Sequence, residues 1–210
     1  MLPTTRPVLL AVFLIGLLCN CGEDQHSPPP AKAPAKDSFN TLPVQIRAPS
    51  LDKSVLDMAY CPEEYPILKM SRKVKTLPIA RVIYSRPLKD GRVIFGGVIK
   101  YGQPWRLGAN EATELELFRD VTIMDQKVKK GRYVMYCIPY ENKWTIVLNN
   151  DLFTWGLKIN EELDEYRFDV PITHINLRYE VFTMEFETLK KGFTLNMAWD
   201  NVHASLPIDE

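Results

Sequence analysis

The sequence has few of the residues that metal and redox sites need, with only three histidines and four cysteines among 210 residues. Cys61 and Cys137, the two cysteines of the main body, have no neighbouring Cys or His at the spacing of zinc ligands. A Gly-x-Ser-x-Gly elbow and a phosphate-binding glycine loop are also missing. We therefore expect no metal site and no cofactor, and the sequence identifies no catalytic triad.

The sequence also lacks an excess of charge of either sign. Its 26 lysines and arginines balance 26 aspartates and glutamates, for a formal net charge of zero. Nucleic-acid binding needs a positive face that displaces counterions from the phosphates, and no basic cluster stands out in the main body. We therefore expect no nucleic-acid partner.

Long apolar runs are absent except at the N-terminus. The run PVLLAVFLIGLL, residues 7–18, follows Arg6 and is too short for a permanent membrane span, so it predicts an export signal over residues 1–20. Leu18 stands three residues before Cys21, as in the lipobox of bacterial lipoproteins, although Asn20 departs from the usual small residue. We predict lipidation at Cys21; the alternative is an ordinary signal peptidase site with an incidental cysteine.

Residues 21–50 are dominated by Pro, Ala and Lys and contain few large apolar residues. Such a composition cannot offset the entropy of ordering, so we expect a disordered, extended tether. With a lipid anchor at Cys21, it would hold the following domain at the cell envelope, on the periplasmic or the surface face of the outer membrane. The predicted membrane partner is thus lipid, reached by an anchor rather than by a spanning helix.

Residues 51–210 show short β-type segments separated by turn residues. This pattern predicts an all-β single domain, an antiparallel β-sandwich or a barrel-like fold. The expected strands include residues 79–84, 92–99, 113–118, 121–124, 133–138, 144–149, 166–170, 179–188 and 193–199. Helix is expected only around residues 54–60 and 160–165. Export would let Cys61 and Cys137 form a disulfide, but spacing alone leaves this open.

Alternation within these segments predicts which side chains form the core. In residues 113–118, Leu115 and Leu117 share one face, and in residues 181–188 Phe182, Met184 and Phe186 share another. We interpret these stripes as core rather than as ligand platforms. The dipeptide Asp90-Gly91 predicts a hairpin turn between residues 79–84 and 92–99.

The segment YGQPWRLGANEAT, residues 101–113, is unlike the strands around it. It carries an aromatic, a guanidinium, an amide and a carboxylate together with two glycines, and two more arginines precede it. Asn in such a turn tolerates a left-handed conformation. The candidate site residues are Arg86, Arg92, Trp105, Arg106, Asn110 and Glu111.

The stretches YSRPLKDGRVIFGG, YGQPWRLGANEATELEL and GRYVMYCIP with WTIVLN together resemble the bacterial "domain of unknown function 2911" family. The dipeptide Trp155-Gly156 and the closing LNMAW also fit, and the resemblance covers roughly residues 58–207. It implies an exported, mostly β domain of bacteria of the Bacteroidetes type. It brings no reaction or ligand, so it assigns no residue a role.

Two of three interpretations of the candidate residues involve no catalysis. In the first, the arginines, Asn110 and Glu111 form a hydrogen-bonded network that pins strand ends, because Arg presents a rigid fork of donors. In the second, the arginines and Asn110, flanked by Trp105 and Trp155, bind a carboxylate, a phosphate or an acidic sugar. We predict the second: a non-catalytic binding module for an anionic small molecule, glycan or peptide.

The third interpretation is a hydrolase-type enzyme. Glu111 would be the general acid or base, and Arg106 would stabilise a developing anion. A two-carboxylate mechanism needs a second acid, and the available ones are Glu114, Asp120 and Asp200. His203 follows Asp200 across an expected turn, but this histidine and His174 are lone residues without a catalytic pattern.

Overall fold

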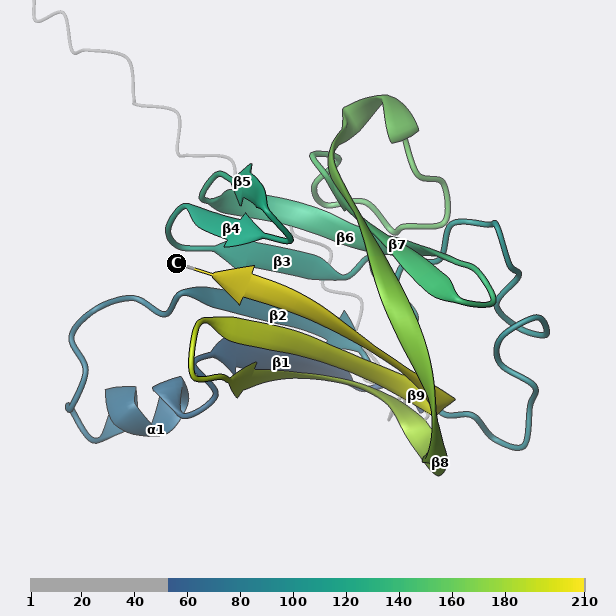
Figure 1. Cartoon of the computed structure of the whole chain (residues 1–210), viewed down its shortest axis with the longest axis horizontal. Coiled ribbons are helices and arrows are strands. Elements are labelled where there is room, and N and C mark those ends of the chain that lie inside the picture. Colours follow the sequence, from purple (N-terminus) through teal and green to yellow (C-terminus); the bar gives the residue numbers. More distant parts are fainter. Residues whose placement is uncertain (1–52, 210) are drawn as a thin grey trace, which may run out of the picture. The chain divides into compact units, whose positions relative to one another are not determined.

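A computed structural model describes residues 53–209, and antiparallel strands are the main secondary structure of these residues (Figure 1). The predicted signal segment, residues 1–20, and tether, residues 21–50, lie outside the described residues. The strands are β1 (Leu56–Cys61), β2 (Ala80–Ser85), β3 (Glu114–Leu117), β4 (Val121–Ile123), β5 (Gln126–Val128), β6 (Gly131–Pro139), β7 (Lys143–Asn149), β8 (Asp164–Thr188) and β9 (Phe193–Asp209). A short helix α1 (Tyr65–Met70) and a 3-10 turn η1 (Glu161–Leu163) complete the described elements.

All strand pairs are antiparallel, and the nine strands form one sheet in the order β1-β2-β3-β6-β7-β8-β9-β4-β5. The predicted all-β fold is therefore confirmed. No helix of the described residues is long and apolar enough to cross a membrane.

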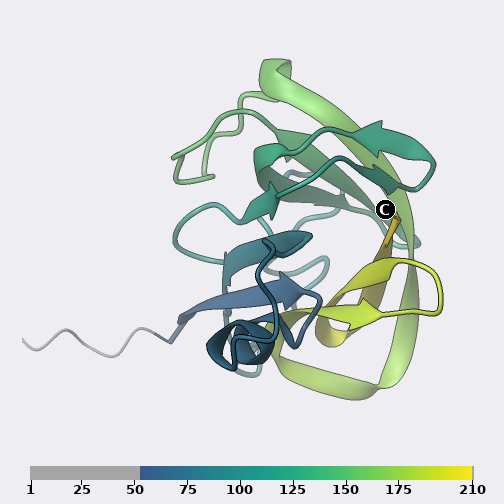
Figure 2. The ribbon, with the colours of Figure 1, turned by 90° about the vertical axis from the view of Figure 1, so that its left-hand side faces the viewer.

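The sheet curls because β8 and β9 are long and bent. The first part of β8, Asp164–Pro171, pairs with β7, and its later part pairs with β9. Register shifts between His174 and Thr183 insert extra residues on β8, which lets the strand bend. Figure 1 shows β8 turning at the lower right, and Figure 2 shows it wrapping around one side of the sheet. The result is a barrel-like half-closed sheet with one interior.

Alternating side chains line that interior as predicted. Leu115 and Leu117 of β3 are buried, and so are Phe182, Met184 and Phe186 of β8. Successive side chains of a strand point to opposite faces, so burial of one face places an apolar residue at every second position of the sequence. This alternation makes a half-buried strand easy to recognise in a sequence.

Two local expectations are wrong. Residues 54–60 do not form a helix, because β1 pairs with β2 over six residues and this pairing outweighs local propensity. Residues 92–99 do not form a strand: Gly96 has φ +80°, and the backbone folds into turns in which Ile99 N–H bonds Ile94 O at 2.9 Å. The Asp90-Gly91 turn is present, with φ of +49° and +70°, but it lies inside a long loop instead of joining two strands.

Aromatic rings fill the centre of the core. Trp105 packs against Phe182, Trp199 and Trp144 with ring centroids 5.0, 5.7 and 5.8 Å apart, and Phe95 lies 6.1 Å away. Each aromatic pair of this kind contributes about 0.5–1.5 kcal/mol beyond its buried area. Trp105 thus ties the loop that carries it to β7, β8 and β9.

Tyr84 joins the end of β2 to β8. Its hydroxyl accepts the backbone N–H of Met184 at 2.9 Å and lies 3.1 Å from the carbonyl oxygen of Met184 and 3.3 Å from the carboxylate of Asp57. Burial is the main cause that raises the pKa of Tyr84 to about 12, and the Met184 N–H opposes this shift. Folding therefore favours the protonated hydroxyl.

Because the folded-state pKa is raised, the folded protein keeps a proton that an unfolded tyrosine loses near its ordinary value of 10.0. The free energy of unfolding should thus fall as the pH rises from about 10 to about 12. Tyr84→Phe should lower stability at neutral pH by about 1–3 kcal/mol and should reduce this pH slope. Denaturant unfolding between pH 8 and 12 measures both, with exposed Tyr101→Phe as the control. An unchanged slope in Tyr84→Phe would contradict the assignment.

Candidate functional site

The predicted site segment, residues 101–113, directly precedes β3 and lies beside the part of β6 that β3 does not cover. Trp105 and Cys137 exchange backbone hydrogen bonds of 2.7 and 2.8 Å, and Met135 N–H bonds Thr113 O at 2.8 Å. Trp105 Nε1 donates to Gly108 O at 3.2 Å, so the only polar atom of this buried ring is satisfied within the segment. The indole is therefore an anchor of the segment.

Other polar groups of the segment also hold it in place. Thr113 Oγ1 donates to Leu107 O at 2.6 Å, and Asn110 Nδ2 donates to Ser54 O at 3.3 Å. Leu107 and Asn110 have left-handed backbones, with φ of +51° and +58°. The left-handed conformation expected at Asn110 is confirmed. These contacts give Asn110 and Thr113 a structural role.

Arg106 points away from this internal network. Its Nη1 donates to Trp155 O at 3.1 Å, and among the described residues its guanidinium has no carboxylate partner. Partial burial lowers the pKa of Arg106. Gly156 is required beside it, because at φ +74° an added Cβ would lie 3.0 Å from Arg106 Cβ. The Trp155-Gly156 pair thus fits closely over Arg106.

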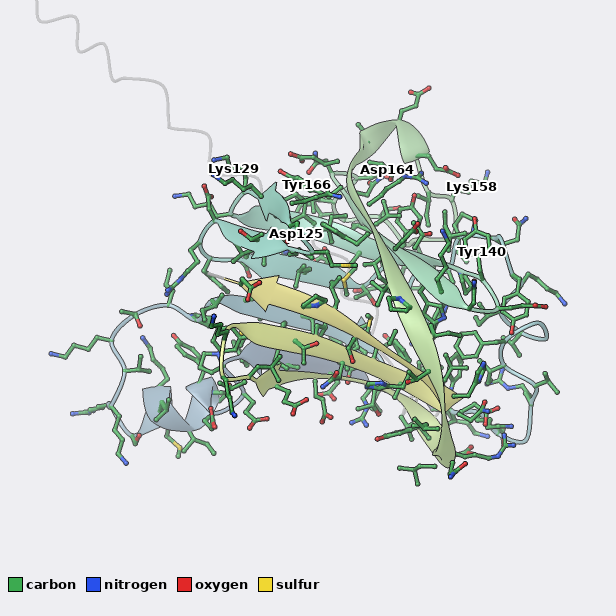
Figure 3. The ribbon with its side chains drawn as sticks, viewed as in Figure 1. Asp125, Lys129, Tyr140, Lys158, Asp164 and Tyr166 are labelled. Carbon is green, nitrogen blue, oxygen red and sulfur yellow. The ribbon has the colours of Figure 1, made fainter. Side chains whose placement is uncertain are left out.

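A hollow of about 420 Å³ opens where the long loop 86–113 meets the loop 150–160. We call it the basic hollow, because Arg92, Lys100 and Arg106 line it, whereas none of the described Asp and Glu residues does. Its apolar wall includes Trp105, Trp199 and Leu157. Both loops lie at the right in Figure 1, and Figure 3 shows Tyr140 and Lys158 on this same side.

The other two cations of the basic hollow are bonded only to backbone carbonyls. Arg92 donates to Lys89 O at 3.0 Å and also to Leu88 O. Lys100 Nζ reaches Gly96 O at 3.5 Å. Within residues 53–209, none of the three cations of the basic hollow has an ion-pair partner. The hollow therefore carries positive charge that no carboxylate of residues 53–209 neutralises in an ion pair.

Glu111 instead lines two adjoining hollows of about 440 and 380 Å³, and Asn110 lines the smaller of them. Both of these hollows are lined by Leu56, Glu111 and Trp155, and we call the two together the Trp155 groove. Glu111 is exposed and forms no hydrogen bond or ion pair with another described residue. The predicted pair of Glu111 and Arg106 thus lines neighbouring hollows rather than one.

Arg86 lies apart from both hollows. Its Nη1 bonds the Asp57 carboxylate at 3.1 Å, its Nη2 bonds Thr183 Oγ1 at 3.0 Å, and its Nε reaches Phe182 O at 3.4 Å. This guanidinium joins β1 to β8, which is the clamp role considered for all the arginines. Of the six candidates, Arg92, Trp105 and Arg106 come together in the basic hollow.

The acids considered as partners of Glu111 are dispersed. Glu114 lines the Trp155 groove but pairs with Arg132 at 2.8 Å. Asp120 pairs with Lys129 at 2.9 Å near the β4–β5 hairpin, on the left in Figure 3. Asp200 is held by Arg178 at 2.7 Å and by Lys89 at 3.5 Å.

The two cysteines of the domain are separate buried thiols. Cys61 lies on β1 and Cys137 on β6, and neither is in a disulfide. Burial raises the pKa of the Cys137 thiol well above its ordinary value, so it stays protonated. Among residues 53–209, no three His, Cys, Asp or Glu side chains are grouped so that they could hold a metal ion.

Sequence reasoning missed Lys100 and Trp199, which complete the basic hollow. Lys100 directly precedes the segment 101–113, and its proximity to that segment was an available signal. Trp199 lies almost 100 residues further along the chain, and nothing in the local pattern links it to Arg106.

A family described as "Protein of unknown function (DUF2911)" matches residues 66–208, and the chain belongs to this family. The resemblance inferred from the sequence is thereby confirmed. No curated protein and no solved structure matches the chain.

Arg86 and Arg106 should differ in how much they contribute to the free energy of unfolding. Arg86→Ala should lower the free energy of unfolding by about 2 kcal/mol, because it breaks three contacts between strands, and should lower the melting temperature by roughly 4–8 °C. Arg106→Ala should change stability by no more than about 0.5 kcal/mol, because it removes one hydrogen bond from a partly desolvated, unpaired cation. Thermal unfolding of the full-length chain measures both. Equal losses in the two variants would show that Arg106 is also a clamp.

Proposed function

We propose that this DUF2911 member is a non-catalytic binding protein whose basic hollow takes the anionic group of a small molecule, glycan or peptide. One observation carries the proposal: Arg92, Lys100 and Arg106 line one hollow to which the described part of the chain contributes no carboxylate. A cluster of like charges is unfavourable unless an ion of opposite charge offsets it.

The chemistry of the hollow suits a carboxylate or a phosphate. A guanidinium offers paired donors to such groups, and an ammonium adds a point charge. Arg106 is partly desolvated, so an anion placed against it recovers interactions that water no longer supplies. The volume of about 420 Å³ and the wall of Trp105 and Trp199 suit a ligand with an apolar or ring-shaped body.

The alternatives have less support. A hydrolase using Glu111 with Arg106 requires both at one reacting centre, and they line different hollows. A two-carboxylate mechanism with Glu114 requires a carboxylate that already pairs with Arg132. A purely structural role accounts for Arg86, whose guanidinium donates hydrogen bonds to residues of β1 and β8. It does not account for the unpaired cations of the basic hollow.

The binding domain would be held at the cell envelope by lipid on Cys21 and by the tether of residues 21–50. The apolar run before Cys21 and the Pro-rich composition after it support this location. Incorporation of labelled fatty acid into the full-length chain, and its loss in Cys21→Ser, tests the anchor. Labelling that persists in Cys21→Ser would place the lipid elsewhere.

Galacturonate and inorganic phosphate are suitable probes of the basic hollow, and tryptophan fluorescence is a suitable signal because Trp105 and Trp199 line it. Arg106→Met and Lys100→Met should each weaken binding about tenfold to a hundredfold, since a charge-assisted contact is worth about 1.5–3 kcal/mol. Binding should also weaken as salt is added.

Lys69→Met is the matched control, because Lys69 is an exposed residue on α1 that lines none of these hollows. It should bind both probes like the unchanged chain. Affinities that are the same in Arg106→Met, Lys100→Met and Lys69→Met would contradict the proposed site, and so would a failure of both anions to bind.

A further inference from the structure

The loop 150–160 exposes two aromatic rings beside the basic hollow. The side chain of Phe153 is 83% exposed and that of Trp155 is 54% exposed, and both line the Trp155 groove. Phe153 has a left-handed backbone, with φ +62°, which is costly for a bulky residue. Packing in the core does not explain why the chain exposes this ring and accepts a strained backbone to do so.

Two arginines, Arg132 and Arg106, hold the residues that carry these rings in place. Arg132 lies 5.6 Å from the centroid of the Phe153 ring and is itself fixed by its ion pair with Glu114. The backbone of Trp155 is held by Arg106, and Gly156 fits closely against the same arginine. The contacts of Arg132 and Arg106 therefore fix the positions of the two aromatic residues in the loop.

The Trp155 groove continues directly from the basic hollow. Ser54 lines both, and the consecutive residues Trp155 and Gly156 line one each. Charge changes along this path: the hollow has three unpaired cations, whereas the groove contains Glu111, which no described side chain neutralises. A ligand that spans the two would thus have an anionic group at one end and a neutral, hydrogen-bonding part at the other.

We infer that the Trp155 groove is a second subsite in which a neutral sugar ring stacks on Trp155, so that the ligand is an acidic oligosaccharide with a uronate in the basic hollow. An exposed indole provides a flat apolar face for a sugar ring, and the Glu111 carboxylate accepts hydrogen bonds from sugar hydroxyls. An acidic peptide would place further carboxylates against Glu111, which is unfavourable. This inference rests on the proposed function, because the uronate needs the basic hollow.

The test uses calorimetry on the full-length chain to compare two ligands that differ by the second ring, together with a neutral and a peptide probe. The probes are glucuronate, the disaccharide of glucuronate and N-acetylglucosamine, the neutral N-acetylglucosamine dimer, and tetraglutamate. The disaccharide should bind about twofold to tenfold more tightly than glucuronate, a gain of the size that an aromatic stacking contact gives. The neutral dimer and tetraglutamate should both bind more weakly than the disaccharide.

The ratio of the disaccharide and glucuronate affinities is the decisive readout. It should fall to near one in Trp155→Ala and be largely retained in Trp155→Phe, which keeps an aromatic face. Trp155 is an exposed residue and Arg106 bonds only its backbone oxygen, so both variants should fold, and a melting curve checks this. Tyr140→Ala is the matched control, because Tyr140 is an exposed aromatic that lines none of the three hollows (Figure 3). It should leave the ratio unchanged.

Three results would overturn the inference. The first is a ratio near one in the unchanged chain, and the second is a ratio that Trp155→Ala leaves intact. The third is tighter binding of tetraglutamate than of the disaccharide, which would assign the groove to an acidic peptide. In all three cases glucuronate binding that depends on Arg106 would still support the anion site, whereas glucuronate binding that ignores Arg106 and Lys100 would remove the proposed function itself.

Discussion

The insertion of Trp105 into the aromatic core is the contact on which the candidate site depends. The ring packs against Trp144, Phe182 and Trp199, and its backbone pairs with Cys137 of β6. Neighbouring side chains of an extended segment point in opposite directions. Burial of Trp105 therefore turns Arg106 away from the core, towards the loop 150–160.

That arrangement separates two sets of polar residues within one segment of sequence. Asn110 and Thr113 spend their donors on nearby carbonyls and stabilise the loop. Arg106 donates to a single carbonyl, that of Trp155, and Glu111 forms no hydrogen bond with another described residue. Each of the two faces a hollow. The cost of leaving a half-buried guanidinium without a carboxylate is reasonable where the residue serves a ligand, because sites often hold groups that the fold alone would not favour.

The strands were predictable from the sequence because burial of one face imposes a period of two, as in Leu115 and Leu117 of β3. Residues 92–99 misled the prediction, since their Val and Ile content favours a strand while Gly96 and Gly97 favour turns. The sequence could not predict that Arg86 joins two strands whereas Arg106 lines the basic hollow. Arg86 finds Asp57 and Thr183 only after β1, β2 and β8 have come together. Arg106 shares a hollow with Lys100 and Trp199 only after Trp105 has paired with Cys137 of β6.

The most direct measurement is a crystal structure of the full-length chain grown with galacturonate. We expect the sugar in the basic hollow, with its carboxylate within hydrogen-bond distance, about 2.7–3.2 Å, of the Arg106 guanidinium and with Lys100 or Arg92 as a second contact. An empty basic hollow beside a galacturonate bound elsewhere would contradict it, and so would Arg106 found in an ion pair with a carboxylate of its own chain.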